Sequence, residues 1–406
     1  MQVYLESLGC RLNAAETETL ARLFAGAGCG VLDAAEGADI IVLNSCAVTE
    51  QAARKSRHRL HTLHRRYPAA RLAVVGCWAT EDTAQVLRMP GVAWAIPNKD
   101  KARAAAIITG VEAQAAAWSP GRWGHTRAFL AVQDGCDHAC TYCVTRLLRG
   151  PARSRPLDDA VQAARDLEAQ GAQEIVLTGV SLGAYGQDLG LPHGLALLVS
   201  ALLRETHVPR LRLSSVEPWD VDSALLALWE NSRLCRQLHI PLQSGSDAVL
   251  KRMGRRNTIA QFAALVTAAR AVSLEIAITT DVIVGFPGES EADFAASLDC
   301  VARLAFARLH VFPYSERPGT AAVRLPDPVP PAVRAERAAK MRALGEQLAA
   351  QYRLNFIGQA LPVLWERRDA AGYWHGLTDN YLEVTTQSEE DLYNRITVLT
   401  LAAGQG

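Results

Sequence analysis

Residues 133–146, QDGCDHACTYCVTR, place three cysteines in one short segment: Cys136, Cys140 and Cys143. Thiolates at such short spacings are soft ligands for zinc or for an iron–sulfur cluster. A structural zinc site takes a fourth Cys or His, and His138, flanked by two of these cysteines, has poor reach toward a shared ion. A four-iron cluster held by three cysteines leaves one iron open to another ligand. The segment favours such a cluster, with zinc or a purely structural role as alternatives.

The cysteine segment follows an apolar run, RAFLAVQ, the first of several strand candidates that alternate with helical patterns up to about residue 314. The later candidates are EIVLTGV, RLRLSSV, QLHIPL, AITTDVIVGF and RLHVFPY. Repeated strand–helix units of this length predict a full or partial parallel barrel, which carries its chemistry at the carboxyl ends of the strands. The three cysteines therefore stand where a barrel has its active site.

A second set of cysteines follows buried strand patterns near the start of the chain. Cys10, Cys46 and Cys77 come directly after QVYLESLG, DIIVLNS and RLAVVG. Strands of this kind, alternating with helices, predict a doubly wound parallel sheet, and such sheets bind ligands outside the carboxyl ends of their strands. We expect these three residues to converge on one site.

The chain is expected to be an α/β protein of three domains. Residues 1–115 form the doubly wound sheet domain, 125–355 the partial barrel with a long final helix, and 358–401 a small all-β module. A less regular stretch, residues 114–128, joins the first two, and the proline-rich LPDPVPPAV precedes the final helix.

The composition limits the partners and the cellular compartment that the protein can have. The 406 residues carry no net charge, so a polyanionic partner must be met by local basic patches. The first residues lack the pattern of a signal peptide, and no apolar run approaches the roughly 18 residues of a membrane span. We expect a cytoplasmic protein with no membrane partner, in which the nine cysteines are reduced.

The motifs resemble those of a known family. CDHACTYC is similar to the CxxxCxxC signature of radical S-adenosylmethionine (SAM) enzymes, with Tyr142 as the aromatic residue usual before the third cysteine. SLGCRLNAAE, LNSCAVT and VVGCW resemble three cysteine signatures of the methylthiotransferase branch. Further matching blocks include RLSSVEP, HIPLQSGSD, TTDVIVGFPGE and HVFPYSERPGT, and GLTDNYLEV resembles the RNA-binding TRAM module.

This resemblance implies two [4Fe–4S] clusters and SAM as cofactors. Cys136, Cys140 and Cys143 would hold the catalytic cluster, which gives one electron to SAM and generates a 5′-deoxyadenosyl radical. Cys10, Cys46 and Cys77 would hold an auxiliary cluster that supplies sulfur. One SAM would donate a methyl group and a second would give the radical, with electrons from an external reductant of flavodoxin or ferredoxin type.

Six further residues are candidates for SAM binding, all near the ends of predicted strands. They are Gly179, Glu217, Gln243, Ser244, Arg252 and Arg255. A glycine lets a ligand approach the backbone, a carboxylate accepts from ribose or amine groups, and a guanidinium fits the methionine carboxylate. The alternative makes them turn glycines and ordinary strand-end polar residues. Asp281 could likewise serve the substrate or cap a turn.

The sequence GCRLNAAE looks most like the branch that modifies N6-threonylcarbamoyladenosine beside the anticodon of transfer RNA (tRNA). The alternatives are isopentenyladenosine in tRNA, whose branch tends toward GCQMN, and a ribosomal-protein aspartate, whose branch tends toward GCPKN. A non-catalytic iron–sulfur protein that binds RNA is the rival from another class.

The predicted RNA partner is the tRNA anticodon stem-loop, met by basic side chains and by aromatic residues of the C-terminal module. The basic candidates are Arg146, Arg149, Arg153 and Arg155, the segment SRHRLHTLHRR, and Lys251, Arg252, Arg255 and Arg256. The aromatic candidates are Trp365, Tyr373, Trp374 and Tyr381, at least half of which are expected to fill the core of the module.

Overall fold

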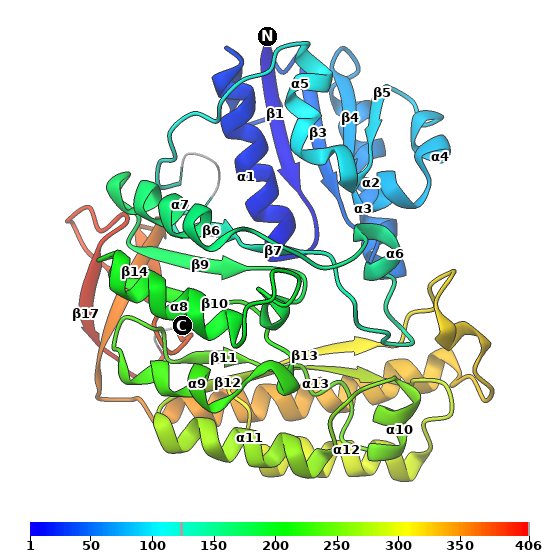
Figure 1. Cartoon of the computed structure of the whole chain (residues 1–406), viewed down its shortest axis with the longest axis vertical. Coiled ribbons are helices and arrows are strands. Elements are labelled where there is room, and N and C mark those ends of the chain that lie inside the picture. Colours follow the sequence, from blue (N-terminus) through cyan, green and yellow to red (C-terminus); the bar gives the residue numbers. More distant parts are fainter. Residues whose placement is uncertain (122–124, 405–406) are drawn as a thin grey trace.

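The computed structural model describes residues 1–121 and 125–404; residues 122–124 of the predicted irregular connection lie outside the described part (Figure 1). The first group of elements is a five-stranded parallel sheet in the order β2-β1-β3-β4-β5. Its strands are β1 (Gln2–Ser7), β2 (Gly30–Leu32), β3 (Ile40–Ser45), β4 (Arg71–Gly76) and β5 (Val92–Ile96). Its helices are α1 (Arg11–Gly26), α2 (Glu50–Arg66), α3 (Cys77–Glu81), α4 (Thr83–Leu87) and α5 (Ala104–Thr109).

Alternate residues of the central strands explain why helices cover both faces of this sheet. Ile41 and Leu43 pack with the apolar face of α2 in one core cluster. Ile40 and Val42 point the other way and pack with Phe24 of α1 in a second cluster. Strands buried on both faces read as continuous apolar runs, which is the pattern seen in the sequence.

The second group of elements is a partial barrel of six parallel strands, formed by the sheets β6-β9-β10 and β11-β12-β13. Parallel bridges between Leu211 and Leu234 and between Ser215 and His239 link the two sheets. The strands are β6 (Ala128–Ala131), β9 (Glu174–Thr178), β10 (Arg210–Leu213), β11 (Gln237–His239), β12 (Ala277–Val284) and β13 (Arg308–Pro313). One apolar core joins them to the surrounding helices.

The barrel helices follow their strands in the predicted alternation. They are α6 (Thr145–Arg149), α7 (Leu157–Ala169), α8 (Gly194–Glu205), α9 (Ser223–Ala227), α10 (Asp247–Arg252), α11 (Ile259–Val272), α12 (Glu291–Leu304) and α13 (Pro331–Leu354). A short ribbon of β7 (Gln133–Asp134) and β8 (Arg153–Ser154) closes the base of the cysteine segment. Helix α1 of the first group packs beside the barrel edge strand β6.

The third group is an antiparallel sheet in the order β16-β15-β14-β17. Its strands are β14 (Ala360–Arg368), β15 (Tyr373–Thr378), β16 (Glu383–Gln387) and β17 (Ile396–Thr400). Trp365 and Trp374 are buried in its core, so half of the aromatic candidates for RNA stacking fill the module instead, as expected. The predicted fold class, with its parallel sheets, partial barrel and small β module, is confirmed.

The arrangement brings the ends of several strands together. In Figure 1 strand β1 points from the upper sheet toward the barrel, and the module lies at the left against the beginnings of the barrel strands. Arg210 donates to the carbonyl oxygens of Pro362 and Leu377 at 2.6 and 3.0 Å, which ties β10 to the module. Across the described residues, no helix is long and apolar enough to cross a membrane.

Candidate active site

The segment of Cys136, Cys140 and Cys143 is held in shape by its backbone. The amide of Cys136 donates to the carbonyl oxygen of Gly150 at 3.1 Å, and that of Thr141 donates to Met253 at the end of α10 at 3.0 Å. Gly135 has a φ of +71°, and a Cβ there would lie 1.9 Å from the carbonyl oxygen of Pro151. Only glycine fits this turn, and the turn starts the cysteine loop.

Two thiols of this loop have raised pKa values. Burial, with smaller contributions from Cys143 and Cys140, raises the pKa of Cys136 to about 11. Burial also raises the pKa of Cys140, against the opposing effect of Arg255. Thiols whose pKa values depend on one another lie close together in space. A bound metal supplies the positive charge that stabilises such thiols as thiolates. The donor set therefore fits an iron–sulfur cluster, and the role of these cysteines as its ligands stays a prediction.

Two of the predicted SAM-binding residues form an ion pair beside this loop. Nη2 of Arg255 donates to Oε2 of Glu217 at 2.6 Å and to the carbonyl oxygen of Pro241 at 2.9 Å. The guanidinium also lies over the ring of Trp219, 4.5 Å from its centroid. Its Nε and Nη1 are buried without a hydrogen-bond partner among the described residues. Buried donors of this kind are costly, so they indicate a ligand that accepts from Arg255 next to Cys140.

The other predicted SAM-binding residues have protein partners, and none of those contacts tests SAM binding. A Cβ on Gly179 would lie 2.9 Å from Oε1 of Gln133, so the close approach there is to a side chain. Gln243 has a φ of +67° and pairs with β12 through its backbone. The hydroxyl of Ser244 faces Ser297, and Nη2 of Arg252 donates to the carbonyl oxygen of Gly288 at 2.7 Å.

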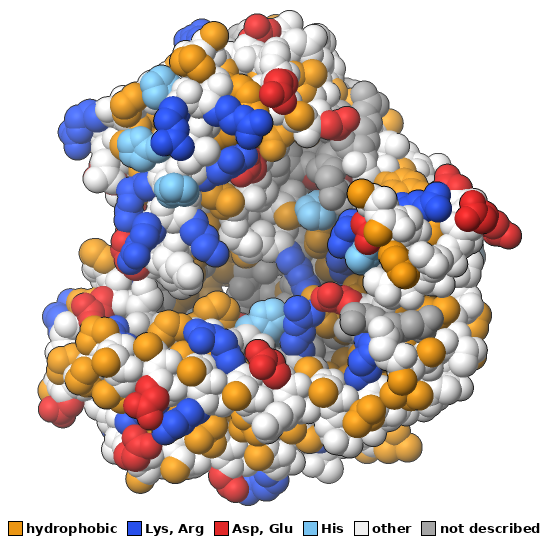
Figure 2. Space-filling model, turned by 180° about the vertical axis from the view of Figure 1, so that it is seen from behind, with side chains coloured by type: hydrophobic (Ala, Val, Ile, Leu, Met, Phe, Trp, Pro, Cys, Tyr) orange, Lys and Arg blue, Asp and Glu red, His pale blue; other side chains and the backbone are white. Residues whose placement is uncertain are grey.

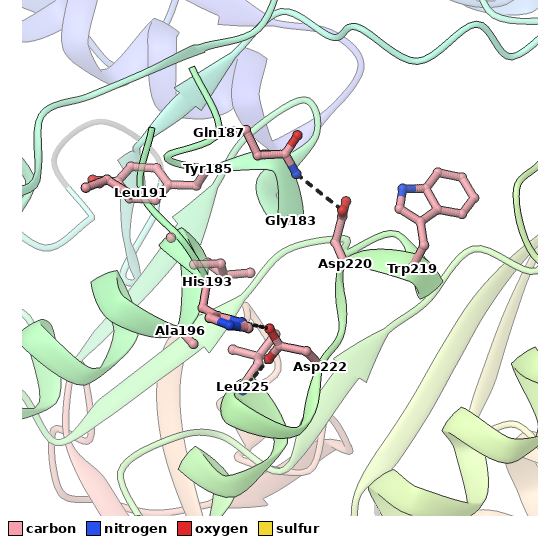
Figure 3. A pocket seen from close by; sticks show the side chains of 12 residues that line it. Gly183, Tyr185, Gln187, Leu191, His193, Ala196, Trp219, Asp220, Asp222 and Leu225 are labelled. Atoms are coloured by element: carbon pink, nitrogen blue, oxygen red, sulfur yellow. Dashed lines mark hydrogen bonds and ion pairs between the residues drawn. The ribbon is translucent and has the colours of Figure 1, made fainter. Parts of the chain in front are cut away.

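A cavity of about 180 Å³ flanks the Glu217 segment (Figure 3). Trp219, Asp220 and Asp222 come from one side and Gln187 and His193 from the other, and the figure shows Gln187 pointing at Asp220. Burial and the nearby carboxylate of Glu217 raise the pKa of Asp220 to about 6. This cavity contains none of the cysteines, so it borders the candidate active site without forming its centre.

Cys10, Cys46 and Cys77 converge as predicted, since they follow β1, β3 and β4 at one end of the sheet. Burial, with smaller contributions from Cys77 and Cys10, raises the pKa of Cys46 to about 11. Cys10 has exposed surface, but many protein atoms surround its thiol. The resulting loss of solvation raises the pKa of the thiol, and Arg149 acts in the opposite direction. A recess of about 320 Å³ opens beside Gly9, Cys46 and Thr49. This recess is lined by Cys46 and not by Cys10 or Cys77. The three thiols suit a second cluster as donors, and their role as its ligands stays a prediction.

Gly9 sets the approach of two of these thiols. Its φ is +104°, and a Cβ there would lie 2.6 Å from Cβ and 2.8 Å from Sγ of Cys46. Within residues 1–121 and 125–404, no three His, Cys, Asp or Glu side chains surround one point closely enough for a single metal ion. A four-iron cluster takes one thiolate on each of three irons, so its cysteines can stand further apart.

Arg149 corrects one prediction and adds a residue to the site. The basic run predicted it as a phosphate contact, but it is buried and bonded to Asn13 and Glu16 of α1 and to Asp134, each at 2.8 Å. It joins the end of the Cys136–Cys143 segment to the helix that begins beside Cys10, and its charge acts on Cys10. Sequence spacing could not show this, because its partner Glu16 is 133 residues away.

Part of the predicted RNA surface remains available. Arg146 and Arg153 are exposed, as are Arg65 and Arg66 of α2. Arg54 and Lys55, which precede the predicted basic segment, are exposed on the same helix. Tyr373 is 41% exposed, and Tyr381 lies in a group of arginines between the three parts of the protein. Arg255 is buried, so it is not part of an exposed RNA surface.

Asp281 lies on β12 next to two histidines of the neighbouring strands. Its Oδ1 is 3.2 Å from Nε2 of His239, and the rings of His239 and His310 are 5.6 Å apart. Burial acts to raise the pKa of Asp281, but the hydrogen bond and charge of His239 outweigh it, and the net effect is a lowered pKa. Asp281 is therefore an ionised group inside the barrel and caps no turn.

Known proteins match this chain over nearly its whole length. Residues 130–301 match the Radical SAM superfamily, and residues 2–96 match a family described as "Uncharacterized protein family UPF0004". The chain is 35% identical to threonylcarbamoyladenosine tRNA methylthiotransferase MtaB of Bacillus subtilis, over 99% of this chain and 94% of that protein. It is 36% identical to the protein of the same name from Thermotoga maritima, over 94% of this chain and 90% of that one.

Other relatives carry a different name at similar identity. The chain is 34% identical to tRNA-2-methylthio-N(6)-dimethylallyladenosine synthase of Novosphingobium aromaticivorans, over 98% of this chain and 95% of that protein. Among solved structures, the radical SAM methyltransferase TsrM of Kitasatospora setae matches with a TM-score of 0.58 and 17% identity, over 79% of this chain and 76% of that one. At that identity the likeness concerns the fold alone.

Proposed function

Since the chain belongs to the radical SAM methylthiotransferase family, which uses SAM and [4Fe–4S] clusters, we propose that it converts N6-threonylcarbamoyladenosine beside the tRNA anticodon into its 2-methylthio derivative. The reaction replaces an aromatic C–H bond by C–SCH₃. This C–H bond has no useful acidity, so no general base of the protein could activate it. The clusters and SAM, when bound, supply the radical, the sulfur and the methyl group.

The chain's own residues would hold and orient these groups. Cys136, Cys140 and Cys143 would hold one cluster, and Cys10, Cys46 and Cys77 the other. Arg255, with its unsatisfied Nε and Nη1, would donate hydrogen bonds to the carboxylate of SAM, and Glu217 would keep the guanidinium in place through their 2.6 Å contact. The apolar walls around Tyr142 and Phe286 would keep water from this end of the site.

The observation that carries the choice of nucleoside is the segment GCRLNAAE, together with the two relatives named for threonylcarbamoyladenosine. Overall identity does not separate the substrates, because relatives named for dimethylallyladenosine are equally similar. RNA contact would come from Arg146, Arg153 and the exposed face of α2, with the anticodon stem-loop as the bound region. A flavodoxin or ferredoxin type of protein would supply electrons, and the work would take place in the cytoplasm.

The test is nucleoside mass spectrometry after anaerobic reaction of the cluster-loaded enzyme with SAM, a reductant and synthetic anticodon stem-loops. Stem-loops carry threonylcarbamoyladenosine, isopentenyladenosine or plain adenosine. Product from the first alone supports the proposal. Product from the second instead moves the enzyme to the isopentenyladenosine branch. Cleavage of SAM without product from any stem-loop points to a protein substrate, and absence of SAM cleavage supports the non-catalytic alternative.

A further inference from the structure

Arg11 follows the predicted cluster ligand Cys10 and lies where the three parts of the protein meet. Its Nη2 hydrogen-bonds to the hydroxyl of Tyr381 in the C-terminal module, and its guanidinium lies 5.5 Å from the centroid of that ring. Tyr381 has a φ of +69°, a conformation that a tyrosine rarely adopts. The module therefore places this ring against an arginine of the first domain at a conformational cost.

Arg11 lies among other arginines, and the carboxylates nearby are engaged with those arginines or with a histidine. Arg127 and Arg212 act on it as like charges, and Glu174 is the nearby carboxylate. Glu174 is already bonded to Arg212 at 2.6 Å, and Arg210 and Arg127 lie 3.6 and 4.0 Å from it. Among the described residues, no carboxylate is within ion-pair distance of Arg11 itself. An arginine in a protein keeps its positive charge, so the position beside the Arg11 guanidinium favours an anion.

The remaining donors of Arg11 are not sealed inside the protein. Its Nε and Nη1 have no hydrogen-bond partner among the described residues, and they are not among the buried atoms that lack one. Figure 2 shows the face that contains a hollow between the upper and lower parts of the molecule, with basic and histidine side chains around it. Arg11 also influences Asp281 and His310, which point into the barrel from β12 and β13.

We propose that Arg11 binds the carboxylate of the threonylcarbamoyl group of the substrate nucleoside. This inference rests on the proposed function, because that nucleoside carries an anion on N6 whereas isopentenyladenosine carries a hydrocarbon. The hydroxyl of Tyr381 uses one N–H of Nη2, so the second N–H of Nη2 can join that of Nε or Nη1 in a planar, two-point contact to a carboxylate. The hydroxyl of Tyr381 holds the guanidinium from the other side. The carboxylate of Asp281 lies 3.2 Å from Nε2 of His239, and among the described residues it makes no ion pair with Arg11.

The experiment compares two anticodon stem-loops, one with threonylcarbamoyladenosine and one in which the threonyl carboxylate is a primary carboxamide. Loss of one charge-assisted contact should lower kcat/KM of the wild-type enzyme for the amide by about 10- to 100-fold. Arg11→Gln should lose a similar factor on the acid and show an acid-to-amide ratio near one. Arg11→Lys should keep part of the preference. Arg103→Gln, at an exposed arginine of the same domain, should behave as wild type.

Iron content and 5′-deoxyadenosine formation are measured for each protein, since Arg11 lies next to Cys10. Equal rates of the wild-type enzyme on acid and amide would overturn the inference, as would an Arg11→Gln enzyme that keeps the wild-type preference. If Arg11→Gln fails to load its clusters, the ratios of the wild type and of Arg11→Lys decide alone. A wild-type enzyme that methylthiolates neither stem-loop but accepts isopentenyladenosine would instead remove the proposed function, and the inference with it.

Discussion

Glu174→Gln should loosen the attachment of the C-terminal module to the barrel. The Glu174 carboxylate is fully buried at the start of β9 and accepts from Nε of Arg212 at 2.6 Å and from Nη2 at 3.2 Å. Arg212 also donates to the carbonyl oxygens of Thr378 and Asp379 at 3.1 Å, at the end of β15. The substitution keeps the size of the side chain but leaves the buried guanidinium without its anion.

The magnitude follows from the ionisation of Glu174. Burial acts to raise the pKa of this carboxyl, but Arg212 outweighs burial and lowers it from 4.5 to about 2. That difference corresponds to about 3 kcal/mol of folding free energy. Because the pKa is lower in the folded protein, this stability is fully present above pH 4.5 and is lost as the pH falls toward 2. At neutral pH we therefore expect Glu174→Gln to lower the free energy of unfolding by about 3 kcal/mol.

The assay is urea unfolding of the variant and the wild type at pH 7, with the shift in midpoint converted through a common slope. Glu390→Gln is the matched control, since Glu390 is mostly exposed and its contact to Arg395 measures 3.4 Å. The control should change the unfolding free energy by less than about 1 kcal/mol. A loss below about 1 kcal/mol for Glu174→Gln would refute the reasoning, because it would mean that the Arg212 charge is compensated elsewhere.

Three other predictions concern the site. Cys140→Ala should abolish formation of 5′-deoxyadenosine from SAM, whereas Cys46→Ala should keep much of it and stop sulfur insertion; full methylthio product from Cys46→Ala would show that its thiol is no cluster ligand. Gly9→Ala should reduce the amount of iron bound near Cys10 and Cys46, because the added Cβ would lie 2.6 Å from Cβ of Cys46. The control Gly37→Ala, at an exposed glycine with nothing within 4 Å of the added Cβ, should bind as much iron as the wild type. Equal iron contents in the two variants would contradict this prediction. Exchange of exposed Arg54, Lys55 and Arg65 of α2 for Gln should weaken tRNA binding several-fold and flatten its dependence on salt, and an unchanged salt slope would exclude this helix from the interface.

The sequence predicted the parts of this fold that depend on local pattern. Runs such as DIIVLNS have the apolar continuity of strands buried on both faces, and parallel strands must end at one edge, so the convergence of Cys10, Cys46 and Cys77 could be foreseen. The alternation of strands and helices after residue 127 predicted the partial barrel in the same way.

Charges with distant partners could not be foreseen. Arg149 lies in a basic run that looks like solvated surface, but Glu16, which is far away in sequence, brings it into the interior. The contact of Arg11 could not be predicted either, since its neighbour Tyr381 is 370 residues further along the chain. Such contacts depend on how the domains pack against one another, and the periodicity within a segment does not predict that packing.

The central claim is that two separate sets of three cysteines each hold a four-iron cluster, and that one cluster has an iron free for SAM. It is tested most directly by the iron content of the anaerobically loaded protein and of the two triple Cys→Ala variants, read with electron paramagnetic resonance after adding SAM. We predict about eight iron atoms per chain in the wild type and about four in each variant. SAM should change the spectrum only where Cys136, Cys140 and Cys143 remain. A variant that keeps all its iron, or a spectrum of the Cys136–Cys140–Cys143 cluster that does not respond to SAM, would contradict the account.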